Sequence, residues 1–534
     1  MEGSDSMAAK PKKPKARKAD NRQFPADPEA MLQEFLALIE DIGPDGFDDE
    51  EFSAEELIED VLSGSFEGDD DLEEVLGELE SVLADLRIET NGGSRPARQE
   101  SRQVRDWLAQ RLEDPKIDGS ALLALGHTFS RADFDPGPAF GTILARRFGQ
   151  ATQVAESSDP TDLLDDVIAE VGDDPFELFD TISRFARFMP GGYRSASAEI
   201  LASSDNMTLR EAALGYLLES DDQTAETVAR VLRQSAAGAA ISASLVAKLV
   251  RMRGLLPPKR HAMLDATIKA LRQKAAAPEP APAVKIVKLA ASTCDGSGGQ
   301  SLIAHVVVGG EHVLLSMMIK NGQGVSECVI LGDMTKRQLE NLLSSSAAQN
   351  DMQFVPIASE LFKRRLAAAV ADNHASGRPV PYGLVALMER TGLAELHPEP
   401  LMAEALFDDM ISGSLFDASF PEALDNAARA LDAAGIMESW FEAGEAVDTL
   451  LDKVKSHKRR LEVLLRDYLP GRRRFWIEQC AWTAAVLKQK PPKKQQSWFH
   501  LALLGKQLCT DQPMSESPLM QFIAQASIKA YLLQ

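Results

Sequence analysis

Cysteines are scarce in this sequence. Only four occur among 534 residues, and no two of them form a CxxC pair. Disulfide frameworks and zinc ribbons need closely spaced cysteines, so the spacing argues against both kinds of site. We therefore expect free thiols, no metal or other cofactor, and a location in the reducing cytoplasm. The four residues are Cys294, Cys328, Cys480 and Cys509.

Long apolar runs are also missing. The longest uncharged stretch in the helical middle of the chain, Gln234–Ala247, covers 14 residues and is rich in alanine and serine. Crossing a bilayer takes about 20 apolar residues. The basic N-terminus lacks the apolar core of a secretory signal. The sequence thus predicts neither export nor insertion into a membrane, and no membrane partner.

Positive charge is absent from one long segment. Between Gln23 and Leu86 there is no lysine or arginine, against 23 aspartates and glutamates, which is most of the net charge of −24. Repulsion among these carboxylates opposes compaction. We therefore expect residues 23–95 to form an acidic, partly helical disordered arm. Residues 1–22 are rich in lysine, proline and alanine, and we expect a disordered basic tail there.

Amphipathic helical patterns dominate the next part of the chain. Between Val104 and Lys274, apolar residues recur at helical spacing in short segments, which Asp, Pro, Gly and Ser separate. Short helices cannot each bury an apolar stripe alone, so we expect them to stack in antiparallel pairs. The sequence predicts a helical repeat domain over residues 96–274.

One of these segments, Leu209-Arg210-Glu211-Ala212-Ala213-Leu214, resembles a helix of HEAT-repeat proteins. The resemblance is one of architecture and covers residues 104–274. It implies an α-solenoid in which small residues let paired helices approach and an arginine faces a neighbouring turn. The segments show no strict period near the roughly 40–47 residues of a HEAT unit. An irregular helical bundle is therefore the alternative.

The residue pattern changes after residues 275–283, whose alanines and prolines predict a semi-rigid linker. Runs of β-branched residues predict four strands, and Gly309-Gly310 fits a hairpin turn. Thr335 and Gln338 form a capping box that opens a helix, and a second helix is predicted over 357–373. Residues 284–380 thus read as a small α+β module. Its predicted strands are Val284–Leu289, Ser301–Val308, His312–Ile319 and Val325–Leu331.

Helical spacing returns in residues 381–534, which we expect to form a helical C-terminal domain. Large aromatic side chains dominate burial, so the four tryptophans of this part are expected to anchor its core. The predicted fold class is mainly α: an irregular HEAT-like α-solenoid or helical bundle, a small α+β module, and a helical C-terminal domain. The four residues are Trp440, Trp476, Trp482 and Trp498.

The glycine-rich loop of residues 294–300 holds two weak catalytic candidates, Asp295 and Ser297. It is similar to the serine motif of chymotrypsin-like proteases, with its first two residues transposed. A phosphate-binding loop is disfavoured because a strand follows and no GxxxxGK sequence occurs. A turn that lets strands approach closely is the favoured interpretation.

Two histidines, His305 and His312, flank the predicted hairpin turn near two of the cysteines. In a hairpin with a two-residue loop, Val307 faces His312 and His305 faces Leu314, so the histidines are not directly paired. A metal site needs a specific number and orientation of ligands. We therefore predict ordinary half-buried histidines and no metal site.

A basic stretch, Lys453–Lys494, contains thirteen lysines and arginines against three acidic residues, with Phe475 and Trp476 interleaved. This combination suits a nucleic-acid backbone, although charge runs are commonly solvated helix faces. In a third interpretation the acidic arm lies on the stretch and competes with nucleic acid. The candidate nucleic-acid-binding residues are Lys455, Lys458, Arg459, Arg460, Arg472, Arg473 and Arg474.

No complete catalytic set emerges from these patterns. The sequence therefore favours a non-enzymatic helical-repeat scaffold that binds another protein. The first alternative is a nucleic-acid-associated protein that uses residues 453–494, with the acidic arm as intramolecular competitor. The second is an enzyme with a site in the 284–380 module.

Overall fold

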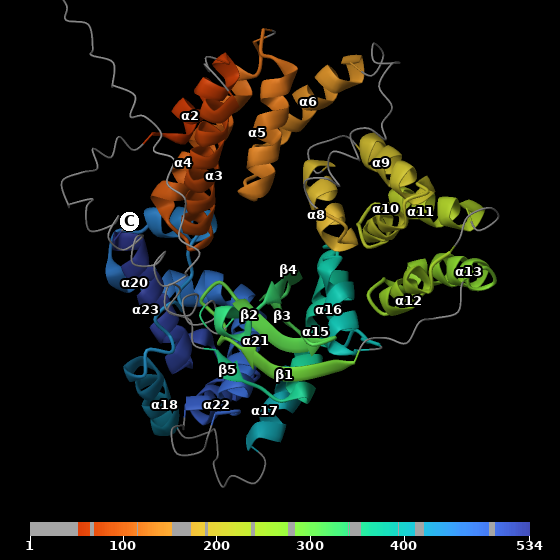
Figure 1. Cartoon of the computed structure of the whole chain (residues 1–534). Coiled ribbons are helices and arrows are strands. Elements are labelled where there is room, and N and C mark those ends of the chain that lie inside the picture. Colours follow the sequence, from red (N-terminus) through yellow and green to blue (C-terminus); the bar gives the residue numbers. More distant parts are fainter. Residues whose placement is uncertain are drawn as a thin grey trace, which may run out of the picture. The chain divides into compact units, whose positions relative to one another are not determined.

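The structure is a computed structural model, and most of its elements are labelled in Figure 1. The chain divides into two units, Met1–Ser53 and Ala54–Gln534, and every helix and strand below belongs to the second. The predicted tail of residues 1–22, the arm up to residue 51 and most of the linker lie outside the described residues. The structure describes residues 52–64, 69–114, 116–151, 172–186, 191–235, 241–275, 283–339, 341, 354–393, 395–411, 421–490 and 497–533.

The first helices share a core of their own. Ser94 caps α4 by accepting a hydrogen bond from the backbone N–H of Ala97 (3.3 Å). Leu57, Leu83 and Val104 are fully buried in this core. The elements are α2 (Ala54–Ser63), α3 (Asp69–Asn91), α4 (Arg95–Arg111), α5 (Gly119–Arg131) and α6 (Pro138–Ala151).

This core corrects the prediction for the acidic segment. Residues 54–63 and 69–91 are helices packed against α4, and not part of a disordered arm. Their leucines gather on one face while carboxylates such as Glu73 and Glu74 stay exposed, so burial proceeds without desolvating charge. The predicted boundary at residue 96 falls inside α4, which packs with the preceding helices rather than starting a new domain.

A second group of helices shares a hydrophobic core with the sheet. Asn206 caps α10 by accepting from the N–H of Thr208 (2.9 Å). These helices and the sheet bury one common core. The predicted series from 104 to 274 therefore divides, since α4–α6 belong to the first core. The elements are α8 (Pro175–Ala186), α9 (Gly191–Ser203), α10 (Met207–Ala212), η1 (Ala213–Leu217), α11 (Asp222–Ser235), α12 (Ala243–Met252), η2 (Pro258–Arg260) and α13 (His261–Arg272).

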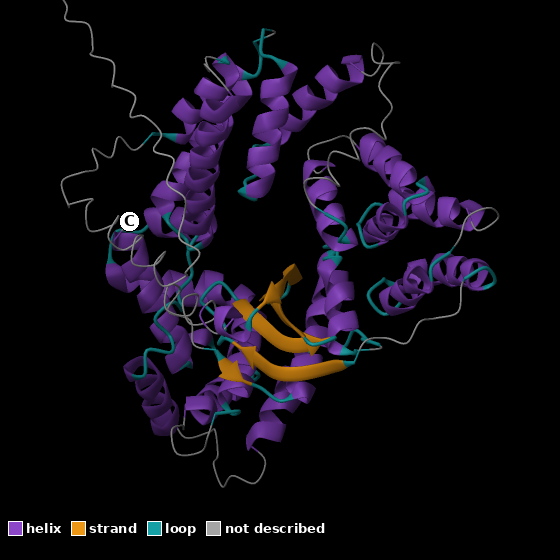
Figure 2. Cartoon of the chain, in the orientation of Figure 1, coloured by secondary structure: helices purple, strands orange, loops and turns teal. Residues whose placement is uncertain are grey.

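The sheet is antiparallel, with strand order β4-β3-β2-β1-β5, and lies among helices in Figure 2. The hairpin turn is confirmed, with φ of +62° at Gly309 and +103° at Gly310. The capping box is confirmed too, because the N–H of Thr335 donates to Gln338 Oε1 (2.9 Å). The strands are β1 (Val284–Ala291), β2 (Gly299–Val308), β3 (Glu311–Lys320), β4 (Gly324–Met334) and β5 (Val355–Pro356).

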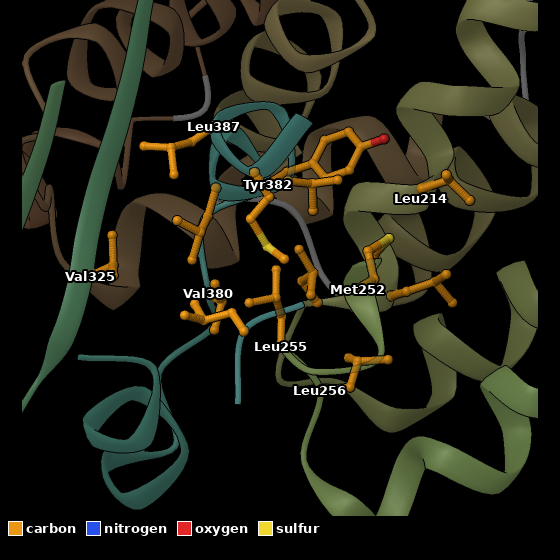
Figure 3. Packing of buried hydrophobic residues seen from close by; sticks show 14 of the residues in the cluster. Leu214, Met252, Leu255, Leu256, Val325, Val380, Tyr382 and Leu387 are labelled. Carbon is orange, nitrogen blue, oxygen red and sulfur yellow. The ribbon is translucent and has the colours of Figure 1, made fainter. Parts of the chain in front are cut away.

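Two helices after the sheet complete this core: α15 (Ser359–Ser376) and α16 (Gly383–Thr391), both in contact with β4. Tyr382 and Leu387 lie across from Met252 of α12 in Figure 3. The Tyr382 hydroxyl donates to the carbonyl of Glu211 in α10 (2.7 Å). The sheet core therefore extends past the predicted boundary at residue 380.

The C-terminal domain is helical, as predicted, and buries Trp440, Trp476 and Trp482 almost completely. Trp498 is half-buried, with the Lys488 ammonium 5.0 Å from its ring centroid. In the described part of the chain, none of the helices has the length and apolar character needed to cross a bilayer. The elements are α17 (Ala403–Ile411), α18 (Pro421–Ala433), α19 (Glu445–Asp452), α20 (His457–Val463), α21 (Leu469–Leu487), α22 (Ser497–Leu508) and α23 (Pro518–Leu533).

Candidate functional site

The glycine-rich loop before β2 is closed by its own aspartate. Asp295 Oδ1 accepts hydrogen bonds from the N–H of Ser297, the hydroxyl of Ser297 and the N–H of Gly299, each at 2.8 Å. The Ser297 hydroxyl therefore donates to a carboxylate. Among the described residues, no histidine or lysine makes a hydrogen bond to it. This geometry is that of an Asx turn, which favours the turn interpretation over catalysis.

The same loop is bound to the C-terminal domain. The N–H of Gly296 donates to Ser439 Oγ (3.0 Å), and Trp440 Nε1 donates to the carbonyl of Cys294 (3.2 Å). A Cβ on residue 296 would overlap the carbonyl oxygen of Ser439, so only glycine fits this approach. Gly298, at φ +84°, packs on the ring of Phe475. The loop thus joins the sheet to the C-terminal helices.

A buried arginine, Arg365 of α15, lies beneath the loop and is 2% exposed. Its Nε donates to Gln300 Oε1 (2.6 Å) and its Nη2 to Asn321 Oδ1 (2.8 Å). The guanidinium carbon lies 4.6 Å from the ring centroid of Trp482. Asn321 in turn donates to Gln479 Oε1 of α21 (3.0 Å). We call Gln300, Asn321, Arg365, Gln479 and Trp482 the polar junction.

The charge of Arg365 has unusual partners. Among the described residues it forms no ion pair within 4 Å, and Nη1 has no hydrogen-bond partner. Burial lowers the pKa of this guanidinium, because desolvation disfavours the charged form. Two neutral amide oxygens and one aromatic face offset part of that desolvation. The polar junction therefore holds a buried cation between the sheet and α21.

Two carboxylates lie close to the polar junction. Burial, followed by repulsion from Glu478, raises the pKa of Asp372. Asp372 Oδ2 accepts from the N–H of Gly322 (3.3 Å), and Glu478 Oε1 accepts from Arg474 Nε (2.9 Å). Burial also raises the pKa of the Cys294 thiol to about 11, so this thiol is neutral at pH 7. These groups can carry charge with little contact to water, but the Cys294 thiol is not an activated nucleophile.

The raised pKa of Asp372 leads to a pH-dependent prediction. Its folded pKa lies above the unfolded value near 3.8, so the stability gained from the protonated form is present below pH 3.8 and lost as pH rises through the folded pKa. Asp372→Asn keeps a neutral acceptor for Gly322. We expect this variant to raise the melting temperature at pH 7 and to leave it unchanged at pH 3, measured by calorimetry.

Asp265→Asn is the matched control for this prediction. A hydrogen bond from Arg253 lowers the pKa of Asp265, so neutralising that carboxylate should lower the melting temperature at pH 7. A lower melting temperature for Asp372→Asn at pH 7 would show that its charged form stabilises the fold.

Most arginines predicted to bind nucleic acid make contacts within the protein. Arg473 donates to three carbonyls of the turn after α22, and Arg460 lies 4.9 Å from the ring centroid of Tyr531. Arg472 pairs with the buried Glu442 (2.8 Å), and Arg474 pairs with Glu478. Arg474 is 80% exposed, whereas the other three arginines are engaged within the fold, which leaves fewer cations of the basic stretch available for phosphates.

Lys455, Lys458 and Arg459 are exposed near the start of α20. Residues 491–494, the end of the basic stretch, lie outside the described residues. The three exposed cations are brought together by local sequence alone, and the fold does not add Arg472 and Arg473 to them, because both are engaged in internal contacts.

The two hairpin histidines have the predicted register, with His305 opposite Leu314 and Val307 opposite His312. Their rings nevertheless meet diagonally, with His305 Nε2 2.8 Å from His312 Nδ1. Diagonal neighbours in a sheet lie within reach of long side chains. No group of three or more His, Cys, Asp or Glu suited to a metal ion occurs among the residues that the structure describes.

The polar junction was missed by sequence reasoning. Gln300 and Arg365 are 65 positions apart, and Asn321 and Gln479 are 158 apart. The glycine-rich loop was the only local indication of this part of the fold. A turn that lets strands approach closely was predicted there, but its contact with Ser439 and Trp440 was not.

Three family models match parts of the chain: the Y4lR second domain at 190–275, a domain of unknown function (DUF7401) at 282–387, and the Y4lR C-terminal helical domain at 401–532. None of these three is a HEAT-repeat model. No solved structure matches the chain. The chain is similar to the uncharacterized protein y4lR of Sinorhizobium fredii (strain NBRC 101917 / NGR234), with 27% identity over 368 residues, which is 67% of this chain and 69% of that protein.

Proposed function

We propose that this protein is a non-enzymatic scaffold that binds another protein through the surface of helices α8–α13. In this proposal, helices α8–α13 form HEAT-like pairs. The observation that carries it is that buried arginines donate hydrogen bonds to backbone carbonyls of neighbouring turns. Arg210, 1% exposed, donates through Nε (3.1 Å) and Nη2 (2.6 Å) to the carbonyl of Ser204. Arg260 donates to the carbonyls of Leu217 (3.0 Å) and Ser220 (3.1 Å).

Bonds of this kind make the helical surface rigid before a partner arrives. A rigid surface loses less conformational entropy on binding, so more of the contact energy appears as affinity. The polar groups near the glycine-rich loop support a non-enzymatic role, since Ser297 and Arg365 are engaged in internal contacts. We place the scaffold in the cytoplasm, because its four cysteines are free thiols.

Affinity capture with the full-length chain tests this proposal. We expect a protein partner to be recovered in a fixed stoichiometric ratio from native lysate and to reduce hydrogen exchange at the exposed residues of α8–α13. Arg230→Glu, which changes an exposed residue of α11, should weaken capture if that face is the contact. Arg429→Glu, on the exposed part of α18, is the matched control. Recovery of no stoichiometric partner, or protection confined to other helices, would contradict the proposal.

A further inference from the structure

Helices α4 and α19 face each other through opposite charges. The three arginines of α4 are three and four residues apart, so they lie on one helix face. The acids of α19 have the same kind of spacing and pair with them in antiparallel order. We call the two sets the arginine row and the acidic row. The pairs are Arg95–Asp452 (Nη2 to Oδ2, 3.5 Å), Arg98–Asp448 (Nη2 to Oδ2, 2.5 Å) and Arg102–Glu445 (Nη2 to Oε2, 2.7 Å).

The rows meet without a shared apolar core. In the described parts of the chain, the buried side chains of α4 cluster with α2, α3, α5 and α6, while Val447 and Leu451 of α19 cluster with the C-terminal helices. The middle pair is the least exposed, with side chains 15% and 14% accessible. The outer pairs are about half exposed or more. Ion pairs exposed to solvent are weak and screened by salt, so a competitor can enter from either end.

We propose that the arginine row is a docking surface for an acidic helix of a partner protein, and that α19 occupies it within the chain. This inference rests on the proposed scaffold function and adds a second contact surface, on α4, to that of α8–α13. The partner helix presents carboxylates at positions i, i+3 and i+7, as Glu445, Asp448 and Asp452 do. Nucleic acid is disfavoured, because a protein with a net charge of −24 repels a long polyanion, whereas three spaced carboxylates match the arginines one to one.

Binding of a synthetic helical peptide with the charge pattern of α19 tests the surface in the full-length protein. Asp448→Lys repels Arg98 and uncovers the intact row. We expect half-saturation of this variant at a peptide concentration at least about tenfold below that of the wild type, since the wild-type row faces a competitor tethered at high effective concentration. Arg98→Glu also breaks the middle pair but removes the central cation, so it should not bind.

Hydrogen exchange measures whether the arginine row is uncovered, separately from whether the peptide binds to it. Both variants should speed exchange in residues 441–452 relative to the wild type at 50 mM NaCl (about 14 Å screening length). Glu199→Lys, which breaks an exposed pair with Arg230 (3.1 Å) elsewhere, is the control and should change neither readout. Unchanged exchange in both variants would overturn the covering by α19. Faster exchange without peptide binding would overturn the acidic-helix surface, and so would binding of a DNA duplex in place of the peptide. Either result would leave the capture result for the scaffold unaffected.

Discussion

Replacing Lys248 with methionine is expected to lower the free energy of unfolding of its domain by about 3–5 kcal/mol. Lys248 is 5% exposed and pairs with Glu211, which is 8% exposed. Its Nζ also donates to Ser244 Oγ (3.1 Å) and lies 4.0 Å from Glu389. Removing the ammonium leaves the Glu211 carboxylate buried without a cation. A buried charge that has lost its partner is among the most destabilising changes in a protein.

Calorimetry measures the effect, because it resolves the transitions of separate domains. A loss of this size corresponds to a fall of roughly 6–20 °C in the transition temperature for a domain of 150–250 residues. Lys259→Met is the matched control, since its pair with Asp222 (2.7 Å) is exposed, and it should cost less than about 1 kcal/mol.

The double variant Lys248→Met with Glu211→Gln distinguishes the cause. It removes both charges, so it should recover a large part of the stability lost by Lys248→Met alone. Equal losses in the single and double variants would mean that packing of the lysine stem, and not its charge, holds α10 and α12 together.

Replacing Trp482 with alanine is the second large expected loss, at about 3–5 kcal/mol. The side chain is 2% exposed in the C-terminal core, so truncation leaves a cavity. It also removes the aromatic face above the Arg365 guanidinium. A buried cation would then keep its two amide partners but lose the ring that offsets part of its desolvation. Calorimetry should show the loss in the transition that includes the polar junction.

Trp482→Phe separates these two contributions. It keeps an aromatic face at smaller volume and should be markedly less destabilising than alanine. A double-mutant cycle of Trp482→Ala with Arg365→Met should give a coupling energy of about 2 kcal/mol. Trp498→Ala, at a half-buried tryptophan, is the control for losing an indole outside the junction. A coupling energy near zero would show that the ring and guanidinium are neighbours without a stabilising interaction.

Local patterns were sufficient for several elements of the fold. The strands from Val284 to Leu331, the turn at Gly309-Gly310 and the capping box at Thr335 were predicted and are present. Each depends on residues close in sequence, whose backbone preferences and hydrogen bonds act over a few positions. The mainly helical class follows in the same way from the period of the apolar residues.

Composition was misleading where burial decided the outcome. The carboxylates between Gln23 and Leu86 predicted disorder, yet Leu57 and Leu83 bury against α4. An acidic helix folds when its charges remain on the solvent side and a partner covers its apolar face. Arg472 and Arg473 show the reverse case, since cations that suggested a nucleic-acid surface contact Glu442 and backbone carbonyls within the fold.

The sequence by itself determined the helical class, the position of four strands, the register of the β2–β3 hairpin, and the glycine loop at 294–299. Only the tertiary structure decided what these elements touch. It brought Arg365 beneath that loop and beside Trp482, and set the arginines of α4 against the acids of α19. Such contacts join residues far apart in the chain, and their strength depends on burial and distance, which local periodicity does not encode.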